Sequence, residues 1–449
     1  MFNHNGHSYW TFAGIDLSGY QNIQINFKGF SQIQGILGMN SIDINTMLED
    51  PYVLENYFDG CSKLNGFYKD EGKYAADEWA FEETAWHEKA HSFKEMFNGC
   101  SSLTERFIKG YLNCSNNAHN NLKDATRMFN NCTSLNKIEL DWNICTSLGG
   151  LKTDGFNGGI NELFKNCSGL TSATIKIKSA TSLKELKQVF ENCIKLNNVQ
   201  INLMGYEGNL PVSYISHIED FQNLFANCSS LTSFNMKDQG KMDYQTGSST
   251  IPNQWQFNSL INATNMFLNC TNLSNITFPD EINLTKATSL ESMFSGCKSL
   301  SEVFTFSPIN LFNETISTTS LSLANMFNRC SVLKNIGYLT VADMTRVINI
   351  NSMFNGCTSL TELELSNWEF ADNTILSLGS VFSNCSSLNN LILPEMKVNS
   401  LNSTFYGCAS LEALDLTNLI PVNLSSAAST FANCSKLSNL TGYKTWNME

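Results

Sequence analysis

The sequence predicts an α/β repeat fold, a curved solenoid in which each repeat supplies one short strand and one short helix. Three observations lead to this prediction. A seven-residue motif, Phe-x-x-Cys-x-x-Leu, occurs thirteen times in the 449 residues. Apolar residues precede each motif at helical spacing, and apolar and polar residues alternate after it. Repetition at intervals of about 20–50 residues is typical of solenoids rather than of globular domains.

The residues before each motif favour a short amphipathic helix. In residues 182–190 the apolar side chains Leu183, Leu186, Val189 and Phe190 share one helical face. The residue just before the motif cysteine is Gly in five copies and Asn in seven, and Arg329 is the exception. Gly and Asn accept the left-handed backbone that ends many helices. We therefore expect each helix to last two or three turns and to stop at the motif.

Four positions of the motif are assigned structural roles, which the copy at residues 354–360 illustrates. Phe354 ends the buried face of the helix, Gly356 turns the chain, Cys357 fills the corner and Leu360 begins the strand. All thirteen motif cysteines occupy this one position, and a free buried cysteine behaves as a small apolar side chain. The total of 15 cysteines is odd, so we expect reduced, structural thiols rather than disulfides.

The residues after each motif favour a strand with one face inward. Leu135, Ile138, Leu140 and Asn143 match the full leucine-rich-repeat pattern. Strands stack about 4.8 Å apart and helices about 8–10 Å apart, so the strand side should be the concave wall. The side chains five, seven and nine positions after each cysteine should then face outward. These include Lys137, Glu139, Asp141, Ser172, Thr174, Lys176, Asn198, Gln200, Asn202, Asn235, Lys237, Glu362, Glu364, Asn390 and Asp415, with Phe304 and Ile392 as apolar exceptions.

Two domains are predicted: an N-terminal cap or docking segment at residues 1–52 and a solenoid of about thirteen repeats at 53–449. Within the first segment, residues 23–27 alternate like a strand. Near the other end, Leu437 begins a strand that no polar cap follows. Because a bare strand edge invites pairing, we expect either a cut chain or a partner at this edge.

Composition excludes some functions. The chain has 28 Lys and Arg against 41 Asp and Glu, a net charge of -13, and no basic run, which disfavours nucleic acid as a partner. No stretch of about 18 apolar residues is present, so we expect no membrane insertion. The N-terminus lacks the features of a signal peptide. No cofactor is expected, and the compartment and the oligomeric state are left open.

The longer form of the motif, Met-Phe-x-x-Cys-x-Ser-Leu, begins at Met96, Met128, Met293 and Met353. In this form the sequence resembles the BspA-like class of leucine-rich repeat over about residues 53–442. The resemblance implies a surface protein of bacteria or protozoa, or a phage-associated protein, that acts in adhesion or protein binding.

The functional prediction is non-enzymatic recognition, adhesion or scaffolding through a repeat surface that meets a protein or a glycan. The alternative is a virion or assembly component, in which the N-terminal segment docks and the repeats act as a spacer. Aromatic side chains in the irregular stretches between motifs are the candidate contacts: Tyr206, Tyr214, Tyr244, Trp255, Trp79 and Trp86.

A second alternative is a zinc peptidase. His87, Glu88 and His91 form the sequence His-Glu-x-x-His, in which two imidazoles one helical turn apart bind zinc and the glutamate is the general base. Phe93 and Phe97 define the inward face of the same predicted helix. The histidines would then point outward, so we expect no catalytic site and no bound metal.

Overall fold

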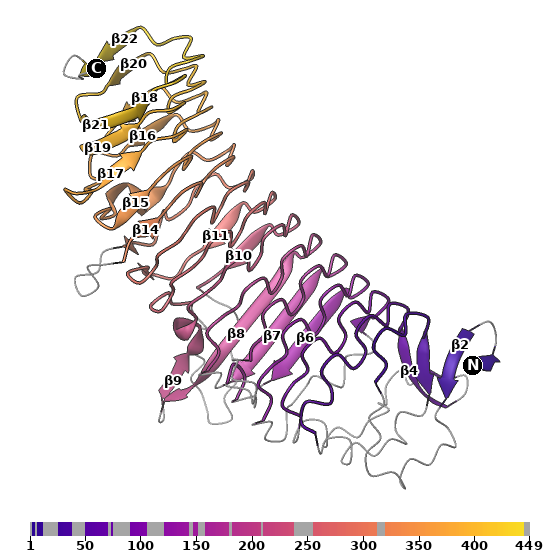
Figure 1. Ribbon diagram of the computed structural model, residues 1–449. Coiled ribbons are helices and arrows are strands. Elements are labelled where there is room, and N and C mark those ends of the chain that lie inside the picture. Colours follow the sequence, from indigo (N-terminus) through magenta and orange to yellow (C-terminus); the bar gives the residue numbers. More distant parts are fainter. Residues whose placement is uncertain are drawn as a thin grey trace. The chain divides into compact units, whose positions relative to one another are not determined.

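The computed structural model describes residues 2–4, 7–11, 26–37, 50–70, 73–74, 90–105, 121–142, 147–150, 158–178, 182–207, 210–237, 255–311 and 319–443. They form two compact units, whose described residues lie up to Ile218 in the first unit and in Glu219–Lys237 and beyond Gln254 in the second. Figure 1 colours the first unit from indigo to magenta and the second from magenta to yellow.

Each motif lies in a series of tight turns, and the predicted helix before it is wrong. In all thirteen copies the residue two positions before the motif Phe has a positive φ of 52–59°, and the residue two positions after it has a positive φ of 56–77°. A right-handed helix cannot include residues in this region of φ. The helical elements of the described chain are two 3-10 turns, η3 (Tyr214–His217) and η4 (Gly337–Val341).

The backbone amides of these turns point alternately in two directions. In residues 56–61, the amides of Asn56, Phe58 and Gly60 donate to carbonyls of residues 94–98 in the next repeat, at 2.7–2.9 Å. The amides between them donate to carbonyls three residues back, at 3.0–3.3 Å. Every amide of the turn is therefore bonded, and the turn side has a parallel, sheet-like ladder where helices were expected.

The motif phenylalanines stack face to face inside each unit. In the first unit the stack runs from Phe27 to Phe190, with ring centroids 5.3–5.6 Å apart. In the second it runs from Phe225 to Phe431, at 5.4–5.9 Å. These separations are close to the spacing of strands and far below that of helices. The spacing argument for a concave strand wall therefore no longer applies.

In the first unit the strands form two sheets. The first sheet contains β1 (Phe2–His4), β2 (His7–Thr11), β3 (Gly35–Leu37), β4 (Gly66–Asp70) and β5 (Lys73–Tyr74), in that order. The second contains β6 (Lys137–Trp142), β7 (Ser172–Lys178), β8 (Asn198–Glu207) and β9 (Leu210–Ser213). Figure 1 shows β6, β7 and β8 side by side, and all three are parallel.

In the second unit, two strand positions recur, and every pair of strands among its described residues is parallel. After the motifs lie β10 (Ser233–Asn235), β11 (Asn275–Thr277), β16 (Glu362–Glu364), β18 (Asn390–Ile392), β20 (Ala413–Asp415) and β22 (Asn439–Thr441). Before the next motif lie β12 (Ile282–Asn283), β13 (Ile309–Asn310), β14 (Leu321–Ser322), β15 (Val347–Asn349), β17 (Ile375–Ser377), β19 (Met396–Ser400) and β21 (Leu419–Ser426).

The predicted strand register is confirmed in β6, β10, β16, β18 and β20, where buried and exposed side chains alternate. Ile138 and Leu140 of β6 are buried and Lys137 and Glu139 are exposed. A count of about thirteen strand–helix repeats is not confirmed, because the described residues contain no α-helix and some motifs there lead into no strand. Residues 23–25 of the predicted N-terminal strand lie outside the described residues.

Candidate functional site

The four motif residues at 354–360 hold the fold together. The Phe354 ring stacks between those of Phe327 and Phe382, at 5.7 and 5.9 Å. Gly356 has the predicted positive φ, of 77°. The Cys357 thiol donates to the carbonyl oxygen of Phe327 in the preceding repeat, at 3.2 Å. Leu360 is fully buried. These side chains are unavailable to a ligand.

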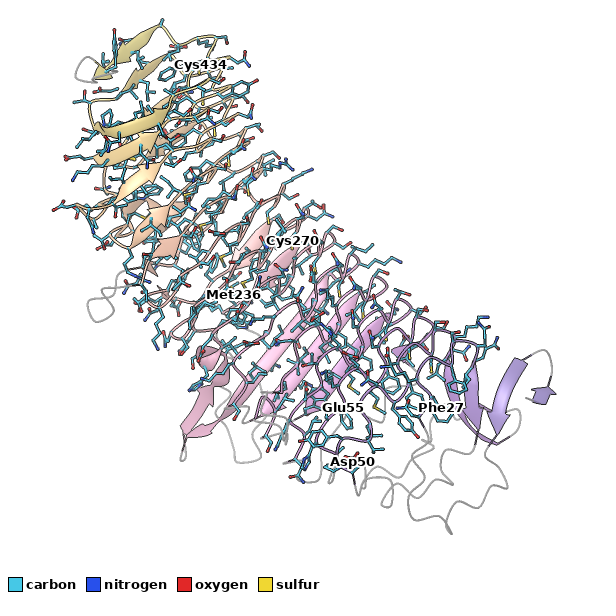
Figure 2. The ribbon with its side chains drawn as sticks, viewed as in Figure 1. Phe27, Asp50, Glu55, Met236, Cys270 and Cys434 are labelled. Carbon is cyan, nitrogen blue, oxygen red and sulfur yellow. The ribbon has the colours of Figure 1, made fainter. Side chains whose placement is uncertain are left out.

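The motif cysteines are free thiols that the interior makes unreactive. Twelve of the thirteen are buried, Cys434 is half-buried, and none forms a disulfide. Figure 2 labels Cys270 and Cys434 among the side chains of the second unit. Burial raises the pKa of Cys167 and of Cys330 to about 12, so the thiolate required of a nucleophile is absent at neutral pH. The prediction of structural thiols is confirmed for these thirteen cysteines.

The sheet of β6, β7 and β8 presents three polar rows on its outer side. The register places Lys137, Ser172 and Asn198 in one row, Glu139, Thr174 and Gln200 in the next, and Asp141, Lys176 and Asn202 in the third.

This polar face contains an ion pair and a buried side-chain amide. The Lys176 ammonium donates to the Glu139 carboxylate at 2.6 Å, across two adjacent strands. Asn202 is only 3% exposed although it has the outward register. The remainder of the face offers hydroxyls, amides and charges to solvent, which is a surface suited to polar contacts.

One of the predicted aromatic contacts is wrong. Trp255 is fully buried, and its ring lies 5.1 Å from that of Phe221 and 5.2 Å from that of Phe234. Its side chain fills the core, and its backbone amide donates to the carbonyl oxygen of Met236. The apolar surface of an indole makes this outcome favourable wherever the core has room.

The other aromatic candidates stay predictions. Tyr206 lies in β8, where its backbone is paired with Pro211 of β9, and Tyr214 begins η3. Tyr244, Trp79 and Trp86 lie outside the described residues.

The zinc alternative also rests mainly on residues outside the described chain, because His87 and Glu88 are not among the described residues. His91 is described, and its ring meets the Tyr52 ring edge to face at 5.6 Å. Its amide donates to Pro51, and its carbonyl accepts from Lys123. Burial and the charge of Lys123 lower the pKa of His91. The described residues contain no group of three or more His, Cys, Asp or Glu side chains placed to hold a metal ion.

A hollow of about 320 Å³ interrupts the outer face of the second unit. Its polar lining comes from Lys334, Asn335, Thr340, Glu362, Glu364 and Asn390. The wall on one side is η4, and the wall on the other is the pair β16–β18.

The described residues contain no helix long and apolar enough to cross a membrane.

Sequence reasoning missed the cause of this hollow. Phe304 has the outward register, but a φ of 56° turns its ring into the core, where it lies 4.8 Å from the ring of Phe278. Gly337 has the same position in the next repeat and a φ of 52°. A large apolar residue and a glycine at two successive outward positions were the available signal.

Comparison with known proteins places the chain in a family. It matches the family described as "Mycoplasma protein of unknown function, DUF285" over residues 76–149, 158–306 and 319–446. Residues 250–368 match the BspA type leucine rich repeat region, in six copies. No curated protein of similar sequence was found.

Two solved structures are similar in part. A leucine-rich repeat protein from Bacteroides ovatus is 17% identical, covers 92% of this chain and 80% of its own, and gives a TM-score of 0.43. A leucine rich cell surface protein from Faecalibacterium prausnitzii is 14% identical, with coverages of 92% and 77% and a TM-score of 0.34. By these family matches the chain belongs to the DUF285 family and carries BspA-like leucine-rich repeats at residues 250–368.

Proposed function

We propose that this protein is a non-enzymatic binding protein whose strand faces hold a protein partner, in adhesion or in scaffolding. The observation that carries the proposal is the separation of core and surface side chains within the repeats. Phe, Cys and Leu of the motif are buried in the core. The strands after the motifs place polar side chains on their outer face, in a fixed register between neighbouring strands.

The geometry of the strands supports this function over catalysis. In β6–β8 the outward side chains form regular rows with the strand spacing of about 4.8 Å, so a partner can meet many side chains at once. Twelve of the thirteen described thiols are buried and Cys434 is half-buried, and the described residues bring no metal-binding group together. A broad polar surface with few reactive groups suits recognition by many modest contacts.

The test is a selection of binders with matched variants of the full chain. A display library of random peptides is selected against the immobilised protein. One variant carries Thr174→Arg, Gln200→Arg and Asn390→Arg on strand faces. The control carries Thr133→Arg, Ile194→Arg and Thr358→Arg, which adds the same charge at exposed positions inside the motifs, directly after the Cys, and outside the strands.

The proposal predicts that selected peptides bind the wild-type chain and the control variant alike and lose at least about tenfold in affinity for the strand variant, a loss of about 1.4 kcal/mol. Thermal unfolding of both variants checks that they fold. Equal losses in the two variants, or no enrichment of any peptide, would contradict the proposal.

A further inference from the structure

The outer strand face of the second unit breaks at two successive repeats. At Phe304 and Gly337 the backbone turns left-handed where neighbouring repeats stay extended. A Cβ at Gly337 would lie 2.2 Å from the carbonyl oxygen of Phe304, so only glycine fits there. The strand after these motifs is reduced to the single bridge between Glu302 and Asn335.

The chain beyond the break is firmly held. Gly337 begins η4, and Leu339 in its centre is fully buried. The Trp368 indole donates to the Leu339 carbonyl at 2.8 Å, and the Tyr338 amide donates to the Phe304 carbonyl at 3.0 Å. The hollow between η4 and β16 is therefore a fixed shape, which lowers the conformational cost of binding there.

The charge at the hollow is unbalanced. Glu362 and Glu364 stand two residues apart on β16, so both carboxylates are on its outer side. Lys334 is the one cation of the lining. Among the described residues neither glutamate is in an ion pair, and Glu364 accepts a hydrogen bond from the Ser366 amide at 3.0 Å. The neighbouring strand adds Asn390 and Ile392 opposite them and no positive charge.

Exposed apolar side chains lie on the elements that border the hollow. Tyr338 and Val341 of η4 are 42% and 57% exposed. Ile392, which pairs with Glu364 across β16 and β18, is 42% exposed. Large apolar side chains left exposed around a polar hollow are a feature of binding surfaces.

We propose that this hollow binds an extended, cationic segment of a protein partner. A lysine or arginine side chain of the segment enters between Glu362 and Glu364, and an apolar neighbour packs on Tyr338 or Ile392. The carboxylates supply charge-assisted hydrogen bonds, which are stronger than those between neutral groups. This inference rests on the proposed function and adds to it a location and a chemical class of partner.

The test uses synthetic peptides of about seven residues that carry one Lys or Arg between apolar residues, with matched peptides that carry Gln or Glu instead. Binding to the full chain is measured by fluorescence anisotropy at low and high salt. The test variant is Glu362→Gln with Glu364→Gln. The control is Glu369→Gln with Asp372→Asn, which removes the same charge from exposed positions of the same repeat that do not line the hollow. A third variant, Tyr338→Ser, removes an exposed apolar side chain of η4.

The cationic peptides are expected to bind the wild type. Their affinity should fall about tenfold or more when the Glu362/Glu364 variant replaces the wild type, and likewise when the wild type is measured at high salt. Their affinity for the control variant should differ from that for the wild type by less than about twofold. The Tyr338 variant should weaken cationic and Gln peptides by the same factor.

Equal losses in the two charge variants would mean general attraction to an acidic chain and would overturn the proposal. Affinities that do not depend on the charge of the peptide would also overturn it. The same holds if the peptides do not bind while glycans of an array bind the wild type and lose affinity for the Glu362/Glu364 variant. Selected peptides that bind a strand face outside the hollow would support the proposed function and contradict the proposed site. A chain that binds no peptide at all would end both.

Discussion

Gly356 shows at one residue what the motif requires of the backbone. Its φ is 77°, and a Cβ there would lie 3.5 Å from the Cα of Arg329, an ordinary contact. Space therefore permits a side chain, and the backbone conformation is what selects the residue. A left-handed residue other than Gly costs about 1–2 kcal/mol, less for Asn and more for a β-branched side chain.

Gly356→Val should therefore destabilise the protein by about 2 kcal/mol, whereas Gly356→Asn should cost about half as much or less. Chemical denaturation of both variants measures the difference. Arg329→Asn is the converse control, because Arg329 has a φ of 61° at the equivalent position of its own motif and should not lose stability. Equal unfolding free energies for the Val and Asn variants would mean that the turn is misassigned.

Arg346 fixes the second unit from within. The residue is 9% exposed, and its guanidinium donates to the carbonyls of Thr285, Ala287, Leu311 and Thr319 and to the Thr319 hydroxyl, at 2.6–3.0 Å. One side chain thereby joins backbone from three repeats. Burial lowers the pKa of this guanidinium, which stays charged at neutral pH.

Arg346→Met should destabilise the protein by about 3 kcal/mol or more, because several buried carbonyls lose a charged donor. Arg346→Lys should recover only part, since an ammonium cannot reach acceptors spread over two preceding repeats. The measurement is the urea midpoint, with the exposed Lys298→Met as control. A loss no larger than that of the control would show that the carbonyls find other partners.

At the scale of elements, a row of charges joins successive turns of the first unit. Arg127 donates to Glu95 at 3.3 Å and to Glu162 at 2.9 Å, and Lys165 bridges Glu162 and Glu191 at 3.5 and 3.1 Å. Burial raises the pKa of Glu162, but the hydrogen bond and charge of Arg127, with Lys165, outweigh burial and bring the pKa below its ordinary value.

A carboxyl whose pKa is lower in the folded state stabilises the fold above its unfolded pKa, and this stability disappears as pH falls through the folded pKa. Stability should therefore decline as the pH drops below about 4.5, and Glu162→Gln should flatten this decline. The free energy of unfolding between pH 7 and 3 measures both. Glu369→Gln, at an exposed position, should keep the wild-type profile, and an unchanged slope for Glu162→Gln would refute the role of the row.

The elements also show where sequence reasoning succeeded. Period-two alternation predicted the strand register, because the same side chains that alternate in β6 also decide which face is buried. The apolar spacing before each motif suggested a helix, since residues such as Leu186, Val189 and Phe190 do share a side of the chain. A left-handed residue at Gln188 breaks that helix. In nine copies this position is Asn or Ser, a turn signal that outweighs apolar spacing.

At the scale of the whole molecule, the repeat and its family could be read from the motif, whereas the candidate site could not. The motif reports the core, which recurs in every copy. The hollow arises where Phe304 and Gly337 depart from the repeat, and a departure reveals its geometry only once the backbone is seen. Trp255 was misplaced for the same reason, because an irregular segment can return to the core.

Stacked turns replace the expected helices beside every motif. Thirteen helices of two turns would put roughly a fifth of the chain in helix. Far-ultraviolet circular dichroism of the full chain tests this directly. The account predicts a spectrum dominated by strand and turn, with the helical double minimum absent. A double minimum with the intensity of that fraction of helix would contradict it.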